Sequence, residues 1–129
     1  MIPALSLGFM GRFGRSTSLR TFDADLRAVD LHPNLVPEAI KLAALRVLMA
    51  RTAGADPSAA SSRAAAELLA YCMVGAETFT AANGSQLADA VENRIDAALD
   101  VGTSSYAKLI LFALHANVIL TSVVERNRL

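Results

Sequence analysis

Residues 104–126 read SSYAKLILFALHANVILTSVVER, and this stretch constrains the fold more strongly than any other part of the chain. Drawn as one helix, it places its polar side chains mainly on one narrow stripe, made of Lys108, His115, Ser122 and Arg126. Almost every other position is apolar, and a helix that is apolar nearly all round must be surrounded by protein. The stretch therefore predicts either the central helix of a bundle or a helix that lies partly in a subunit interface.

Asn117 departs from this pattern, because it falls among apolar residues on the side opposite the stripe. A buried amide needs hydrogen-bond partners, so the position predicts an Asn that bonds to a neighbouring helix and fixes the packing register. A second interpretation stays open, in which His115 and Asn117 line a ligand pocket together with Tyr71 and Cys72.

The same segment contains the one candidate for a membrane span, Leu109–Val124. Its sixteen residues include His115 and Asn117. A helix that crosses the hydrocarbon core needs about 20 predominantly apolar residues. A membrane is therefore not an expected partner.

Working outward from this segment, helical periodicity accounts for nearly all of the chain after residue 15. The predicted helices span residues 16–30, 37–52, 57–82, 85–101 and 104–126, with one more short turn around Asn34. No segment shows the sustained alternation of a strand. The sequence predicts an all-α protein, a single-domain bundle of about five helices over residues 16–129, preceded by an irregular arm at residues 1–15.

Residues at the segment boundaries support this division. Asp56, Ser85 and Ser104 stand where helices begin and predict side-chain caps. Gly102 predicts the end of the fourth helix. Gly75 lies inside the third predicted helix, where a missing side chain would let a neighbouring helix approach closely.

The fourth predicted helix is amphipathic. Its apolar stripe, predicted to be buried, consists of Leu87, Val91, Ile95, Ala98 and Leu99. Asp89, Asp96 and Asp100 fall on the other side. We interpret these carboxylates as a solvated helix face and not as a cation site, because such a face is the normal exterior of an amphipathic helix.

The arm ends in a loop, residues 11–16, that reads GRFGRS and runs into the first predicted helix. Backbone N–H groups and arginines at a helix start can hold an anion, so Arg12, Arg15 and Ser16 form a candidate anion site. The loop matches no phosphate-binding motif, and an arm that packs against a partner is the preferred interpretation. A secretory signal is not expected, because both arginines follow the apolar residues.

Composition excludes several classes of protein. The 129 residues are 53% hydrophobic and 19% charged, with a formal net charge of zero. These values exclude a disordered chain and argue against nucleic-acid binding by bulk charge. The single cysteine, Cys72, cannot form an internal disulfide, which favours a cytoplasmic protein. Ten Arg against two Lys, with many alanines, favour a GC-rich bacterial genome.

Charge is unevenly distributed along the chain. Residues 1–51 carry a formal charge of +3, residues 56–102 carry −5, and residues 103–129 carry +2. An acidic middle between basic ends predicts charge complementarity within the chain or between two chains.

Catalytic and metal-binding motifs are absent from the sequence. His32 and His115 are far apart, and no HExxH, CxxC or nucleophile-elbow spacing occurs. Cys72 lies among apolar residues, a position typical of an inert core thiol. We expect no metal, no cofactor and no enzymatic activity, and the chain resembles no family known to us.

These observations favour a non-enzymatic helical protein that self-associates, with a homodimer as the expected form. The expected interface residues are Leu111, Leu114, Val118 and Ile119. The alternative is a bundle that binds a small molecule or a lipid. A third and less favoured function is nucleic-acid binding through the arginine-containing arm.

Overall fold

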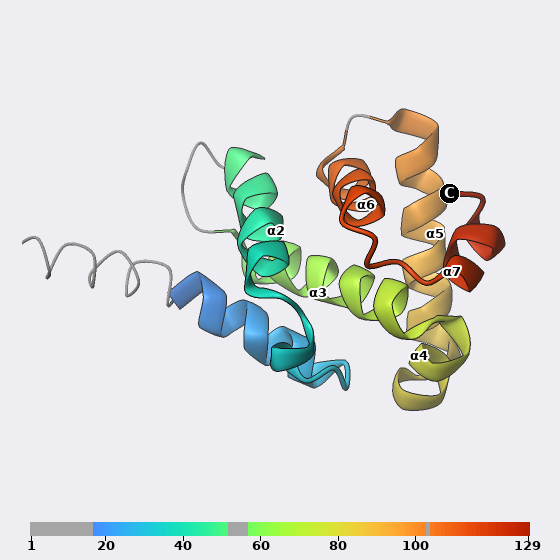
Figure 1. The fold of residues 1–129 in the computed structure, drawn as a ribbon, viewed down its shortest axis with the longest axis horizontal. Helices are drawn as coiled ribbons and strands as arrows, with labels where there is room; N and C mark the ends of the chain where they lie inside the picture. Colours follow the sequence, from blue (N-terminus) through green and yellow to red (C-terminus); the bar gives the residue numbers. More distant parts are fainter. Residues whose placement is uncertain (1–16, 52–56, 103) are drawn as a thin grey trace, which may run out of the picture.

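The computed structural model describes residues 17–51, 57–102 and 104–129. Within these ranges the chain forms helices and no strand (Figure 1), which confirms the predicted all-α class. The elements are a first helix described over residues 17–28, a short 3-10 helix η1 (Pro33–Leu35), and the helices α2 (Glu38–Arg51), α3 (Ala59–Val74), α4 (Ala76–Asn83), α5 (Ser85–Val101), α6 (Ser105–His115) and α7 (Thr121–Asn127). The expected number of about five helices is close, because two predicted helices are each divided in two.

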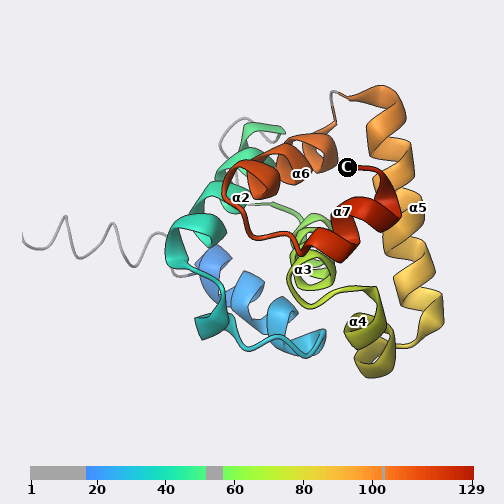
Figure 2. The same ribbon diagram turned by 45° about the vertical axis from the view of Figure 1, so that its right-hand side comes forward.

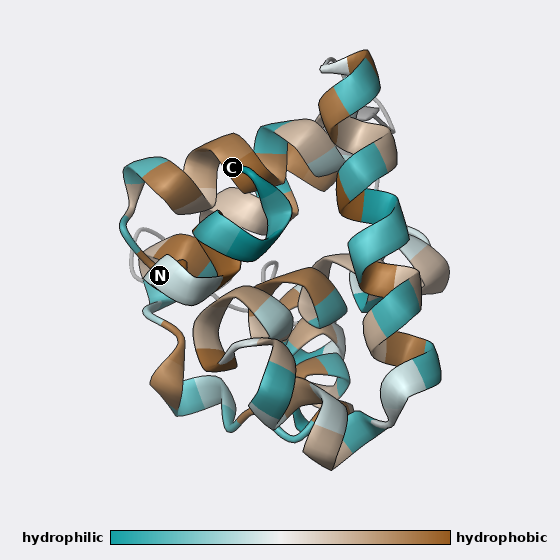
Figure 3. Cartoon of the chain, turned by 90° about the vertical axis from the view of Figure 1, so that its right-hand side faces the viewer, coloured by the Kyte–Doolittle hydropathy of each residue, from teal (hydrophilic) through white to brown (hydrophobic). Residues whose placement is uncertain are grey.

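Helix α3 occupies the centre of the molecule. Its residues 65–72 are buried without interruption, which requires neighbours on every side of the helix. It contacts α2, α4, α5 and α6, and Figure 2 shows these helices arranged around it. Of the two alternatives for the segment 104–126, the central helix is therefore excluded, and a helix that lies partly in a subunit interface stays a prediction. Alanines make up much of α3 and let its neighbours approach closely. Helix α6 lies further from the centre, and its residues are mostly hydrophobic, as the brown bands in Figure 3 show.

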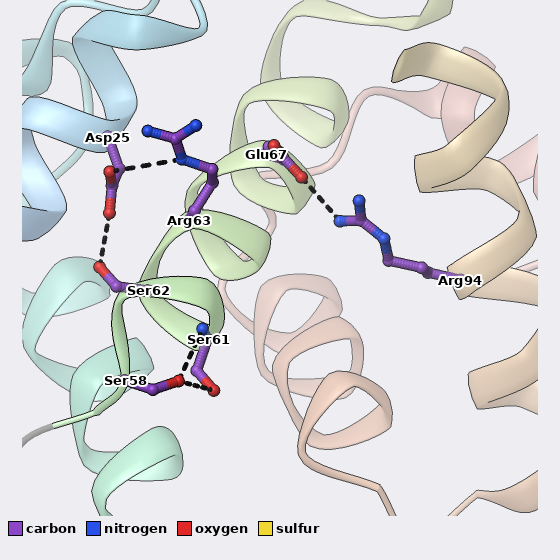
Figure 4. Close-up of polar contacts among 7 residues, drawn as sticks. All are labelled: Asp25, Ser58, Ser61, Ser62, Arg63, Glu67 and Arg94. Carbon is purple, nitrogen blue, oxygen red and sulfur yellow. Dashed lines mark hydrogen bonds and ion pairs between the residues drawn. The ribbon is translucent and has the colours of Figure 1, made fainter. Parts of the chain in front are cut away.

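The buried serine and glutamate of α3, Ser62 and Glu67, are each paired. Ser62 Oγ donates a hydrogen bond to Asp25 Oδ2 over 2.8 Å, and Arg63 Nε lies 3.9 Å from the other oxygen of that carboxylate. On the opposite side, Arg94 Nη1 of α5 donates to Glu67 Oε1 over 2.7 Å (Figure 4). The Asp25 contacts connect α3 to the first helix, and the Glu67 contact connects it to α5. Burying Ser62 or Glu67 unpaired would be costly.

Gly75 divides the third predicted helix. Its backbone has φ 93° and ψ 161°, a conformation essentially restricted to glycine, so α3 ends there and α4 begins at the next residue. In a continuous helix, Tyr71 and Phe79 would be separated by about 12 Å along the axis. The break instead brings their rings into edge-to-face contact, with centroids 5.7 Å apart. The expected role of Gly75, close approach within a continuous helix, is corrected to that of a chain break.

Asn117 divides the last predicted helix. It adopts a left-handed backbone (φ 59°), and Val118 N–H and Asn117 N–H bond back to the carbonyls of Ala113 and Leu114. This pair of bonds is the Schellman motif that ends helices, and Asn is a common substitute for Gly at its left-handed position. The Asn117 side chain is exposed, so the prediction of a buried amide that fixes packing register is wrong.

The segment that follows Asn117 is attached to the end of α3. Leu120 N–H donates a hydrogen bond to the carbonyl of Cys72 over 2.9 Å, which satisfies a carbonyl that the break at Gly75 leaves without a helical partner. A β-carbon at Gly75 would lie 3.2 Å from Leu120 Cδ1. The two chain breaks therefore meet, and the path of residues 116–120 depends on the absence of a side chain at position 75.

The predicted caps have mixed outcomes. Ser104 caps α6 as expected, because its Oγ accepts from Ala107 N–H over 3.1 Å, and Gly102 ends α5 in a left-handed conformation. Ser85 is the first residue of α5 and not its cap, since Gly84 holds that position. Ser58 caps α3. Asp56 lies outside the described residues.

Replacing Gly75 with Ala should lower the free energy of unfolding more than the same change at Gly84. Both glycines share almost the same backbone conformation, so each substitution should cost roughly 1–3 kcal/mol in backbone strain. Only the β-carbon at position 75 meets a neighbour, because nothing lies within 4 Å of one at position 84. Urea unfolding of both variants measures the difference, and an equal loss would contradict the proposed contact with Leu120.

Replacing Arg94 with Met should destabilise the fold by about 1–3 kcal/mol, because it leaves the buried Glu67 carboxylate without its partner. Arg63→Met is the matched control, since that side chain is 64% exposed and its pair is long. An exposed pair contributes little, so the control should stay within about 0.5 kcal/mol of the wild type. Thermal unfolding of the two variants makes the comparison, and similar losses would refute the central role of the Glu67–Arg94 pair.

Candidate functional site

The four residues of the predicted ligand pocket lie in two different environments. Tyr71 and Cys72 are fully buried in α3. His115 and Asn117 are exposed at the end of α6. The Tyr71 ring packs against Phe79, so no open wall is left on that side for a ligand. The structure gives no support to a common pocket formed by these residues.

Tyr71 instead belongs to a polar cluster that joins three helices, formed with Glu92, Arg126 and Asn127. Glu92 Oε2 accepts hydrogen bonds from both Tyr71 Oη and Arg126 Nε. Asn127 Nδ2 donates to Tyr71 Oη over 3.1 Å and also to the carbonyl of Val123. The cluster therefore connects α3, α5 and α7 through satisfied side chains.

The environment of this cluster keeps its tyrosine neutral and its glutamate ionised. Burial raises the pKa of Tyr71 to about 12, an effect that the Asn127 hydrogen bond opposes and Glu92 strengthens. Burial also acts to raise the pKa of Glu92, but the hydrogen bonds from Arg126 and Tyr71 outweigh it and lower that pKa. A buried phenol of such high pKa is not a general base at neutral pH. We interpret the cluster as a structural connection between helices.

Cys72 has the environment of a core thiol. Burial raises its pKa to about 12, so the reactive thiolate is not formed at neutral pH. The sequence-based interpretation of an inert residue agrees with this.

Tyr106 is a half-buried residue with a buried hydroxyl, and the sequence analysis did not single it out. Its hydroxyl has no hydrogen-bond partner within the part of the chain that the structure describes. Burial raises the pKa of Tyr106, and the nearby Arg94 guanidinium opposes that rise. The hydroxyl therefore lies beside the Glu67–Arg94 pair without belonging to it.

The surface of the described residues has an apolar groove between α5 and α6, which we call the α5–α6 groove. It has a volume of about 210 Å³ and is lined by Ala98, Leu99, Gly102, Ala107, Ile110, Leu111, Leu114 and Leu129. Leu99 is 44% exposed although the sequence placed it on the buried stripe of its helix, and Leu111 is 57% exposed. Val101, the last residue of α5, is 66% exposed.

The predicted interface residues are only partly on this surface. Leu111 and Leu114 line the α5–α6 groove, as the interface prediction requires. Val118 is half-buried, and Ile119 belongs to the hydrophobic core with 8% exposure. The break at Asn117 separates the two pairs, because it takes residues 118 and 119 out of the helix that carries Leu111 and Leu114.

The groove also contains residues that the sequence analysis missed. Leu129 reaches it because α7, like α6, ends at a left-handed residue, here Arg128 (φ 58°), after which Leu129 N–H bonds to the carbonyl of Val124. No sequence signal points to Leu129, since its position depends on how α7 lies against α5 and α6.

The remaining predicted sites are untested or without structural support. Arg12, Arg15 and Ser16 lie outside the described residues, so the anion-site prediction stays a prediction. Within the described ranges, no three His, Cys, Asp or Glu side chains are grouped so that they could hold a metal ion.

No single helix among the described residues is long and apolar enough to cross a membrane. Helix α5 and residues Tyr106–His115 reach the necessary length and hydropathy only as a pair, and the two segments are bent by 94°.

Comparisons with known proteins do not assign the chain to a family: no family model, no curated protein and no solved structure matches it.

The free energy of unfolding should fall as the pH rises from 9 to 12. The pKa values of Cys72 and Tyr71 are each about 12 in the folded chain, above their ordinary values of 9.0 and 10.0. Stability contributed by the protonated groups is therefore complete below pH 9 and is lost as the pH rises toward 12.

Cys72→Ala tests this dependence, because it removes the group whose effect begins at pH 9. Relative to the wild type, the loss of stability with pH should be shallower by up to about 1.4 kcal/mol per pH unit between pH 9 and 12. Denaturant unfolding at a series of pH values gives both slopes. Identical slopes would show that the Cys72 thiol ionises in the folded state as easily as in the unfolded chain.

Proposed function

We propose that this protein is a non-enzymatic helical interaction module that self-associates, as a homodimer, through the α5–α6 groove. One observation carries the proposal. Among the described residues, two of the five large hydrophobic side chains that are exposed, Leu99 of α5 and Leu111 of α6, line this groove. Clustered apolar exposure marks interaction sites, whereas scattered exposed leucines do not.

The size of the groove favours a protein partner over a small ligand. Pockets for small molecules typically measure about 300–1,000 Å³ and enclose their ligand. The α5–α6 groove, at about 210 Å³, is smaller and open, and it suits one or two inserted side chains. Exposed leucines beside it can supply those side chains from a second copy. The single buried cysteine supports a cytoplasmic setting for this function, and the composition supports a bacterial one.

Leu111→Glu should weaken self-association by at least about tenfold, because it places a charge in the apolar interface. Sedimentation equilibrium measures the effect, since the wild type should approach twice the 13.6 kDa mass of one chain. Leu35→Glu is the matched control, because Leu35 is 65% exposed and lies in η1, away from the groove. Ile119 is unsuitable as a test site, since a charge in the core would unfold the chain.

Each outcome of this experiment is informative. A wild type that stays monomeric at several hundred micromolar would overturn the proposal. Dissociation by Leu35→Glu but not by Leu111→Glu would place the interface elsewhere. Native mass spectrometry of the same samples tests the alternative function, because a bare dimer supports self-association and a retained small molecule would favour a ligand-binding bundle.

A further inference from the structure

A polar depression adjoins the α5–α6 groove on the side of α7. It has a volume of about 560 Å³ and is lined by Asp96, Leu99, Asp100, Arg126, Asn127 and Arg128. Leu99 lines both the depression and the groove, and Leu129 of the groove directly follows Arg128. The two features therefore form one continuous surface, half apolar and half charged.

Charges of opposite sign stand on the two walls of this depression. Asp96 and Asp100 lie one helical turn apart on α5 and are exposed. Arg126 and Arg128, also exposed, form the wall that belongs to the end of α7. The acidic middle and basic end of the sequence thus meet at one place on the surface.

These opposite charges do not neutralise one another within the chain. The ion pairs formed among the described residues join Lys41 to Asp23, Arg63 to Asp25, Arg94 to Glu67 and Arg126 to Glu92. Asp96, Asp100 and Arg128 take part in none of them, so the depression holds two carboxylates and a guanidinium that are available to another molecule.

We propose that the second copy of the chain supplies the missing partners about a two-fold axis through this depression, beside Leu99. In a two-fold interface, if residue i of one copy meets residue j of the other, then j also meets i. The acidic wall of each copy then faces the basic wall of its partner subunit, and the Asp100–Arg128 pairing occurs twice. This inference rests on the proposed self-association and adds its register, by which we mean how the two copies are aligned against each other.

The arrangement gives each half of the surface a separate role. The apolar half supplies contact area and affinity. The charged half selects one orientation, because a copy docked the other way round would bring like charges together. Exposed pairs of this kind are screened by salt, so dimerisation should weaken as ionic strength rises.

Charge exchange between positions 100 and 128 tests this register. Asp100→Arg alone would bring two arginines together at both contacts of its homodimer, and Arg128→Asp alone would bring two aspartates together. Each single variant should dimerise at least about tenfold more weakly than the wild type. An equimolar mixture of the two should form a heterodimer of near wild-type affinity, because both of its contacts again join opposite charges.

Two further variants complete the design. The double variant with both exchanges should recover wild-type dimerisation, since its homodimer also pairs opposite charges. Asp89→Arg is the control, because it makes the same charge change at an exposed position of the same helix that does not line the depression. It should leave the association constant within about twofold of the wild type. Native mass spectrometry distinguishes homodimers from the heterodimer by mass.

The outcomes separate this register from self-association itself. Single variants that dimerise like the wild type would overturn the register and leave the dimer through the α5–α6 groove intact. Recovery in the double variant without recovery in the mixture would mean that positions 100 and 128 interact within one chain, which also overturns it. A wild type that does not dimerise at all would refute both proposals.

Discussion

The structure depends on the complete burial of α3, whose residues 65–72 have protein on every side. A helix in this position must be narrow, and alanines provide the narrowness that lets α2, α4, α5 and α6 contact it. It must also carry no unpaired charge. Glu67 is tolerated there because Arg94 of α5 pairs with it, and Ser62 because Asp25 of the first helix accepts its hydrogen bond. These contacts connect the central helix α3 to α5 and to the first helix.

A central helix also requires the chain to turn sharply at its end. Gly75 makes that turn in one residue, and Asn117 makes a similar turn at the end of α6. The hydrogen bond from Leu120 N–H to the Cys72 carbonyl connects the two turns, so that residues far apart in the sequence complete each other's backbone bonding. The Tyr71 cluster then fixes α7 beside the same turn.

The surface that results is asymmetric in its chemistry. Helix α5 uses one face to pack against α3 and leaves Leu99 at the edge, where the apolar groove meets the charged depression. The sequence predicted Leu111 and Leu114, which line one wall of that groove, as interface residues, because their helix is more apolar than a peripheral helix needs to be. It missed Leu99 and Leu129, since a groove between helices exists only once their relative positions are known.

Local patterns in the sequence determined the all-α class, the bounds of α5 and the helix stop at Gly102, because periodicity and capping act over a few neighbouring residues. Only the tertiary structure decided that the chain breaks at Gly75 and Asn117. A glycine or an asparagine is compatible with a continuous helix as well as with its end, and here distant contacts select the break. The tertiary structure also decided which helix is central, because an apolar stripe has the same pattern whether it faces the core or the solvent. In the same way, Glu67 can be buried in the central helix only because Arg94, 27 positions away in the sequence, lies beside it.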